Sequence, residues 1–113
     1  MQKDKRKLID DFVASLSDIY GSHLKCVILY GSYARRDNRA DSDIDIMILV
    51  DISELEAKAY QESLSELKYN FYYDHDTEIN PIVHSEDTFN KWVNVYPFFK
   101  NIVNEGVILY GAA

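Results

Sequence analysis

Hydrophobic residues occur along this chain either at helical spacing or in short continuous runs of strand length. The order of these two patterns predicts the helices and strands. A helical repeat runs over residues 3 to 20, where Gly21 can end it. Its apolar positions are Leu8, Ile9, Phe12, Val13, Leu16, Ile19 and Tyr20. Short apolar runs follow over residues 26 to 30 and 43 to 50, and each has the length of a strand. The first half therefore predicts one helix and two strands.

The next part of the chain repeats this alternation. Ser53 and Glu56 have the spacing of a capping box, so we expect a helix to begin there. An apolar stripe continues through it at Leu55, Ala59, Leu64, Leu67 and Phe71. Residues 77 to 84 predict a third strand, and Pro81, which has no N–H to donate, favours a sheet edge or a bulge.

The last third of the chain contains two helix starts. Ser85 can cap a helix, Pro97 can begin another, and Gly106 can end the second before the apolar residues 107 to 110. The first of these helices carries Phe89, Trp92, Val93 and Tyr96. Strands interleaved with helices over 113 residues predict one α/β domain, residues 1 to 113.

Charge and cysteine content limit the partners of the chain. Its 12 Lys and Arg against 19 Asp and Glu give a formal net charge of −7, which disfavours general nucleic-acid binding. Cys26 is the only cysteine, so no intramolecular disulfide can form and a reducing compartment is expected. No apolar run approaches the length of a membrane span. We therefore expect a cytoplasmic protein with no membrane partner.

The candidate chemistry lies in residues 31 to 45, GSYARRDNRADSDID, between the first two strands. Asp43 and Asp45 are two residues apart, so an extended chain projects both to one side, with α-carbons about 6.5 to 7 Å apart. Two such carboxylates favour a cation, and oxygen ligands completed by substrate phosphates suit Mg²⁺. Gly31 lets the backbone approach a ligand, and Ser32 can cap a following turn whose N–H groups favour phosphate. Together they predict a nucleoside triphosphate site.

This motif carries a resemblance to a known family. Gly31-Ser32, ten intervening residues and Asp43-Ile44-Asp45 resemble the signature of the minimal nucleotidyltransferase (MNT) family, a branch of the DNA polymerase beta-like superfamily. The resemblance covers nearly the whole chain and implies a nucleotidyltransferase fold, α/β or α+β, with a small mixed sheet and helices packed against it. Family members often have glycine where this chain has Arg36, so the two differ in the backbone expected there.

The resemblance also implies an activity, the Mg²⁺-dependent transfer of AMP from ATP with two metal ions. In the family an acid on the third strand completes a carboxylate triad. Glu78 matches it as the only acid within the apolar stretch, and the alternative, Asn80, would leave the triad incomplete. The predicted catalytic and metal-binding residues are Asp43, Asp45 and Glu78, and the predicted nucleotide-binding residues are Gly31, Ser32 and Arg35.

The acceptor is the remaining question. Proteins that this chain resembles are commonly antitoxins paired with a HEPN-domain ribonuclease toxin, and several transfer AMP to a tyrosine of that toxin. A HEPN-type toxin is therefore the expected partner, because 113 residues leave no room for a separate acceptor-binding lobe. Two alternatives stay open: a non-catalytic antitoxin that blocks its partner by contact, and nucleotidyl transfer to a small molecule. The aromatic residues 69 to 76 are either half-buried packing or a platform for a base.

Overall fold

The computed structural model describes residues 3–39 and 42–111. Its strands form a mixed sheet in the order β3-β2-β1-β4. They are β1 (Leu24–Tyr30), β2 (Ile44–Val50), β3 (Ile79–Ser85) and β4 (Val107–Gly111). β1 runs antiparallel to β2 and β4, whereas β2 and β3 run parallel. The predicted small mixed sheet is confirmed, with the addition of β4, which the sequence pattern did not mark as a strand.

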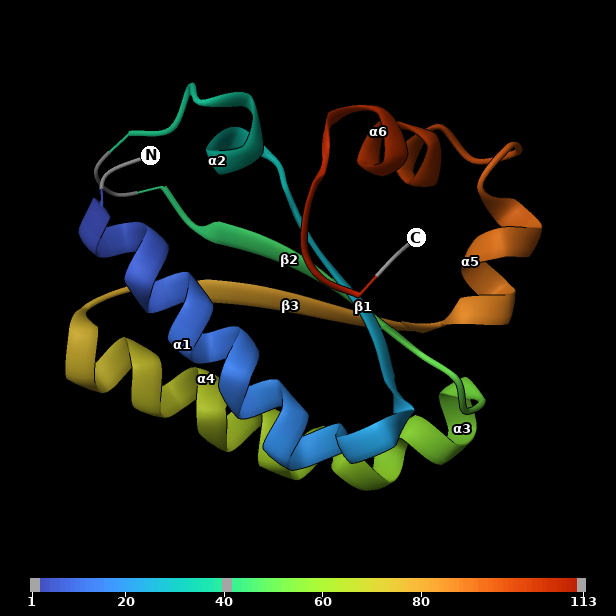
Figure 1. The fold of residues 1–113 in the computed structure, drawn as a ribbon, viewed down its shortest axis with the longest axis horizontal. Helices are drawn as coiled ribbons and strands as arrows, with labels where there is room; N and C mark the ends of the chain where they lie inside the picture. The colour runs from blue at the N-terminus through green and yellow to red at the C-terminus, as the bar shows by residue number, and fades with distance from the viewer. Residues whose placement is uncertain (1–2, 40–41, 112–113) are drawn as a thin grey trace.

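Helices cover both faces of this sheet (Figure 1). The α-helices are α1 (Lys3–Tyr20), α2 (Ser32–Arg35), α3 (Glu54–Ala57), α4 (Gln61–His75), α5 (Glu86–Trp92) and α6 (Pro97–Glu105). Two short 3₁₀ helices are η1 (Gly21–His23) and η2 (Lys58–Tyr60). α1 and α4 lie side by side on one face, and α5 and α6 pack against the other.

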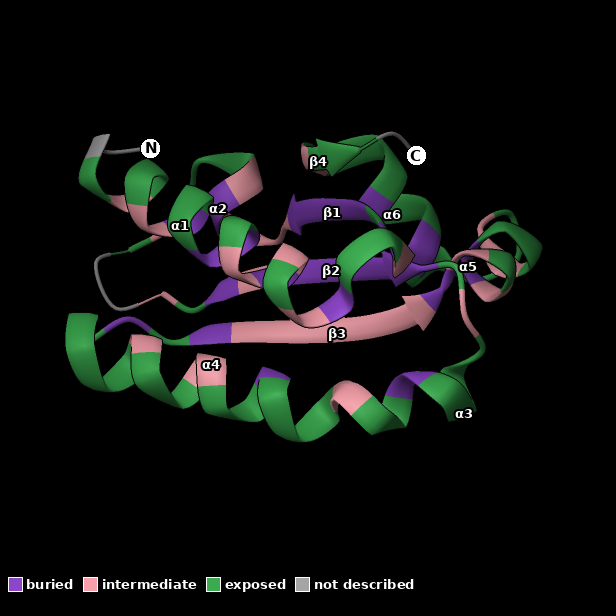
Figure 2. Cartoon of the chain, turned by 60° about the horizontal axis from the view of Figure 1, so that its bottom comes forward, coloured by how far each residue is buried: buried purple, intermediate pink, exposed green. Residues whose placement is uncertain are grey.

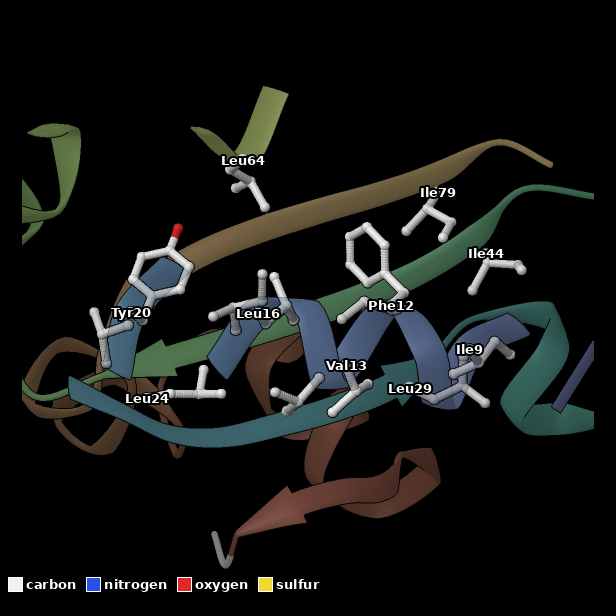
Figure 3. Packing of buried hydrophobic residues seen from close by; sticks show 14 of the residues in the cluster. Ile9, Phe12, Val13, Leu16, Tyr20, Leu24, Leu29, Ile44, Leu64 and Ile79 are labelled. Atoms are coloured by element: carbon white, nitrogen blue, oxygen red, sulfur yellow. The ribbon is translucent and has the colours of Figure 1, made fainter. Parts of the chain in front are cut away.

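The alternation of side chains along β2 separates two cores. Ile44, Ile46 and Ile48 point into the larger core with α1 and α4, whereas Met47 and Leu49 join α5 and α6 in the smaller one. Figure 3 shows the larger core, where α1 side chains pack over the strands. Figure 2 shows β1 and β2 buried, as expected for strands covered on both faces. By the same alternation, Asp45, which lies between Ile44 and Ile46, faces the side of the sheet covered by α5 and α6.

The prediction that an apolar helical stripe begins at Leu55 is wrong for the first turns of this segment. The capping box at Ser53 is present, but α3 ends at Ala57 and η2 precedes α4. A 3₁₀ helix has three residues per turn rather than 3.6, so it rotates the apolar stripe around the axis. Leu55 is consequently 75% exposed, and Ala57 is buried in its place.

Several other local expectations hold. α1 has the predicted bounds, β3 lies at the edge of the sheet, and the Thr88 N–H donates to the Ser85 hydroxyl at 3.0 Å to cap α5. α4 extends to His75, so the aromatic segment after residue 69 belongs mostly to a helix. Within the two described ranges, no helix is both long and apolar enough to cross a membrane.

Candidate active site

Asp45 lies at the centre of a row of side chains that crosses three strands. The register pairs it with Tyr30 of β1 on one side and with Asn80 of β3 on the other. Residues paired in this way share a face of the sheet, which here is the face covered by α5 and α6. β2 therefore presents Asp45 between a phenol and an amide.

The amide of Asn80 connects the two predicted carboxylates. Its Nδ2 donates a hydrogen bond to Oδ2 of Asp43 at 3.0 Å, and it also hydrogen-bonds to Asp45. Asp43 is exposed and directly precedes β2, where the N–H of Ile44 donates to the carbonyl of Glu78 at 2.9 Å. This backbone bond holds the start of β2 against β3, so Asn80 reaches both acids.

The pKa of Asp45 is raised above its ordinary value of 3.8, chiefly by burial. The hydrogen bond from Asn80 opposes this shift, the charge of Asp43 adds to it, and the charge of Arg35 lowers it. Burial, with the nearby Asp45, also raises the pKa of Tyr30 to about 12. Asp45 thus carries negative charge that its surroundings disfavour, which is the electrostatic condition for taking up a cation.

Gly31 is required where it stands. Its φ is +74°, and a Cβ at this position would collide with Oδ2 of Asp45. Gly31 is also the N-cap residue of α2, so Ser32, predicted to cap this turn, is instead the first helical residue. At the other end of α2, Arg36 has φ +63° in the left-handed region, where glycine is favoured. Position 36 therefore has the left-handed conformation that a glycine would adopt easily, although the residue there is an arginine.

A hollow of about 380 Å³ opens beside Asp45. Its lining comes from the ends of β1 and β2, from α2 and from α6: Tyr30, Gly31, Ser32, Arg35, Asp45, Phe98, Asn101, Ile102 and Glu105. Figure 1 shows α2 and α6 next to each other on this side of the sheet. The predicted nucleotide-binding residues thus share one space with Asp45. Sequence reasoning did not place α6 there, because no motif in residues 97 to 105 signals it.

Arg35 lies at the rim of this hollow with its charge already partnered. Its Nε is 3.2 Å from Asp37, and its Nη1 is 3.6 Å from Glu105 on α6. All three side chains are substantially exposed, so these ion pairs are weak and can exchange for a phosphate. The role predicted for Arg35 in nucleotide binding stays a prediction.

Glu78 occupies a different position from Asp45. It directly precedes β3 and lines a hollow beside α4 with Tyr69 and Tyr72, and it shares another with Asp43. Asn80, the alternative for the third position, is the residue paired with Asp45. In residues 3–39 and 42–111, no three His, Cys, Asp or Glu side chains are grouped to hold a metal ion. The third-acid role of Glu78 stays a prediction, and the geometry favours Asn80 beside the two aspartates.

The donor set nevertheless suits a magnesium nucleotide. Mg²⁺ is usually bound through one or two carboxylates, completed by water and substrate phosphates. Asp43 and Asp45 supply two carboxylates, and the Gly31 turn leaves the backbone open beside them. The residues present therefore fit one such ion without a third acid.

Comparisons with known proteins agree with this geometry. The family model "Polymerase beta, Nucleotidyltransferase" matches residues 15–113. The Methanocaldococcus jannaschii protein named "Putative protein adenylyltransferase MJ0604" is 36% identical over 107 residues, which cover 95% of this chain and 99% of the relative.

Two solved structures share the fold. A Sulfolobus solfataricus protein, described as a "putative nucleotidyltransferase", has a TM-score of 0.63 at 22% identity, covering 93% of this chain and 78% of that one. A Shewanella oneidensis complex of a tri-AMPylated HEPN toxin with an MNT antitoxin has a TM-score of 0.50 at 17% identity, covering 94% of this chain and 72% of that one. The arrangement of the sheet, the match of the family model and the 36% identity together establish that this chain belongs to the polymerase beta nucleotidyltransferase family.

Proposed function

We propose that this chain transfers AMP from ATP to a hydroxyl group of a protein partner, and that the partner is a HEPN-type toxin. One observation carries the proposal. The glycine turn touches the carboxylate of Asp45 and opens into the same hollow, and Asn80 ties Asp45 to Asp43, the second carboxylate for a cation.

The residues divide the work of nucleotidyl transfer between them. Asp43 and Asp45 would hold Mg²⁺, which would supply positive charge to the triphosphate and the leaving pyrophosphate. Gly31 lets the backbone approach the phosphates, and the hydroxyl of Ser32 lies in the same hollow to donate to them. Asn80 holds both carboxylates in position before the nucleotide arrives. Such preorganisation supplies much of what this reaction asks of a protein.

A protein acceptor is supported by the relatives rather than by the site itself. The relative that is 36% identical is named for protein adenylylation. The Shewanella complex contains an AMPylated HEPN toxin bound to an MNT antitoxin. A second metal ion, and Glu78 as its ligand or as the base that takes the acceptor proton, stay predictions from the family resemblance.

Transfer of label from α-labelled ATP tests this proposal. The purified chain is incubated with Mg-ATP and a HEPN protein encoded beside it, and label on the HEPN protein is measured. We expect the Asp43→Asn/Asp45→Asn double variant to remain folded and to lose transfer. The matched control, Asp51→Asn, removes an aspartate at the opposite end of β2 and should retain it. Undiminished transfer by the double variant would refute the assignment.

A specific observation favours a second candidate, an antitoxin that acts by contact alone. Asn80 stands at the position paired with Asp45, and no group of three acids is present among the described residues. In this case the Asp43→Asn/Asp45→Asn double variant, without any nucleotide, would inhibit its partner as strongly as the parent chain does with Mg-ATP. Nucleotide-dependent inhibition that the double variant lacks would exclude this candidate.

A further inference from the structure

One face of α6 opens into the hollow that contains the glycine turn. Phe98, Asn101 and Glu105 line it, at positions three and four residues apart, which places them along one side of the helix. Gly31, Ser32 and Asp45 form the facing wall. The hollow thus has one wall suited to phosphates and a cation, and a second with a phenyl ring and an amide.

Phe98 is held in place although it is exposed. Its side chain is 45% exposed, whereas the next residue, Phe99, is buried in the smaller core. The ring of Tyr30 meets that of Phe98 edge to face, with centroids 5.7 Å apart. Because Tyr30 is paired with Asp45 in the sheet, the ring of Phe98 has a defined position relative to the carboxylates.

The size and chemistry of the hollow suit a nucleoside. At about 380 Å³ it lies within the usual range of small-molecule sites. An aromatic ring offers a stacking surface to any base. An asparagine side chain offers one donor and one acceptor, which match N7 and the 6-amino group of adenine, whereas guanine presents two acceptors at the same edge.

We propose that this face of α6 receives the nucleobase, with Phe98 stacking on it and Asn101 selecting adenine over guanine. The inference rests on the proposed function, since it assumes that the phosphates of the same nucleotide lie at Gly31 and Ser32. It gives α6, which the motif does not include, the role of choosing the nucleotide.

The tyrosines of α4 are the competing platform, and their place in the fold argues against them. Tyr69 and Tyr73 stack with centroids 6.2 Å apart and are well exposed. However, α4 covers the face of the sheet opposite to Asp45. The hollow that Tyr69 lines contains Glu78 but neither Asp45 nor the glycine turn. A base stacked there would be separated by the sheet from Asp45 and from the glycine turn, although Asp43 shares a hollow with Tyr72.

Equilibrium binding to the full chain tests the inference, with Mg-ATP, Mg-GTP and Mg-tripolyphosphate as probes. Phe98→Ala and Phe98→Leu should weaken Mg-ATP binding by about tenfold or more, because they remove the stacking ring. Mg-tripolyphosphate has no base, so its binding should change by less than about twofold. Phe98→Trp should retain Mg-ATP affinity. Asn101→Ala should reduce the ratio of ATP to GTP affinity.

Val103 provides the matched control on the same helix. It is 51% exposed and does not line the hollow, so Val103→Ala should bind all three probes as the parent does. Parental Mg-ATP affinity in folded Phe98→Ala and Phe98→Leu would overturn the inference and leave the proposed function intact. If the parent binds neither Mg-ATP nor Mg-tripolyphosphate, the proposed function fails, and the inference fails with it.

Discussion

The two ends of β2 both carry aspartates, and the fold treats their charges in opposite ways. Asp51, just after β2, lies 2.7 Å from Nδ1 of His23 and 3.4 Å from Nζ of Lys25. The hydrogen bond to His23 is the main cause that lowers the pKa of Asp51. Near the start of the strand, Asp45 has an amide and a second carboxylate beside it, and its pKa is raised. The protein thus pairs Asp51 directly with His23 and Lys25, whereas Arg35, the cation that acts on Asp45, forms its own ion pairs with Asp37 and Glu105.

The difference shows which acids serve the fold and which remain available to a ligand. At the end with Asp51, Glu54 repeats the pattern, with its Oε1 2.9 Å from Nδ1 of His84, and its pKa is lowered by that hydrogen bond. These pairs are largely exposed and therefore contribute little stability, but they leave no charge unsatisfied. We call the end with Asp51 the paired end and the end with Asp45 the open end.

The largest effect is expected from replacing the glycine at the open end, and the glycine near the paired end serves as its control. Gly31→Ala at the open end should lower the free energy of unfolding by about 2 to 3 kcal/mol, because strain at positive φ adds to a clash with the Asp45 carboxylate. Displacement of that carboxylate should also reduce transfer by about 100-fold. Urea unfolding and the labelled-ATP assay measure the two effects.

Gly21, which precedes the paired end, is the control for this comparison. Its φ is +56°, but no atom lies within 4 Å of an added Cβ, so Gly21→Ala should cost about 1 kcal/mol from strain alone and should leave the rate of transfer unchanged. Equal losses of stability and rate in the two variants would mean that the contact between Gly31 and Asp45 has no special role.

A second comparison separates the two candidates for the third position at the open end. Asn80→Ala removes the amide that connects Asp43 and Asp45, so Mg-ATP affinity should fall by about tenfold. Glu78→Gln should change that affinity by less than about twofold, because Asn80 rather than Glu78 is hydrogen-bonded to Asp43 and paired with Asp45. Calorimetric titration measures both. A larger loss in Glu78→Gln would restore Glu78 as the third acid and exclude Asn80 from that position.

A third prediction concerns backbone strain, which is concentrated near the open end. Arg36 and Asp76 are the non-glycine residues with positive φ within the described parts of the chain. Arg36→Gly should raise the free energy of unfolding by up to about 1 kcal/mol, because glycine adopts this conformation without a Cβ clash. Asp76→Gly should raise it less, since aspartate tolerates the left-handed region better. A decrease in both variants, measured by urea unfolding, would show that neither position is strained.

The smallest effect tests the sign of the electrostatics. Asp45→Asn should raise the free energy of unfolding at pH 7 by about 0.5 kcal/mol, because it removes a carboxylate that burial disfavours. Asp51→Asn should lower it, because His23 and Lys25 lose their partner. Urea unfolding of both variants at pH 7 measures these changes. Shifts of the same sign would remove the electrostatic contrast between the two ends.

The pH dependence follows from the same shifts. Asp45 has a folded pKa above its ordinary 3.8, so its unfavourable contribution appears as the pH rises above 3.8 and is complete above the folded pKa. Asp51 has a folded pKa below 3.8, so its favourable contribution is present above 3.8 and is lost as the pH falls through the folded value. Mg²⁺ should lower the pKa of Asp45, which carboxyl NMR titration with and without the ion measures.

Local sequence pattern predicted much of the fold, and it placed the glycine turn and the two aspartates of the candidate site near strand ends. The bounds of α1, the cap at Ser85 and the edge position of β3 follow from periodicity, capping chemistry and proline. The phase of the helix after Ser53 was not predictable, because a short 3₁₀ segment rotates it without a sequence signal. β4 was also missed, since an apolar stretch after Gly106 gains strand partners only in the folded chain.

The sequence by itself determined that a glycine turn and two aspartates lie at adjacent strand ends, because a period of two and a glycine with positive φ are local properties. Only the tertiary structure decided that Asn80 of β3 lies beside Asp45 of β2. It also decided that α6 forms the wall of the hollow opposite the glycine turn. Such neighbours depend on register and packing between distant segments. No local pattern encodes these, since contacts across the sheet are decided only when all its strands have assembled.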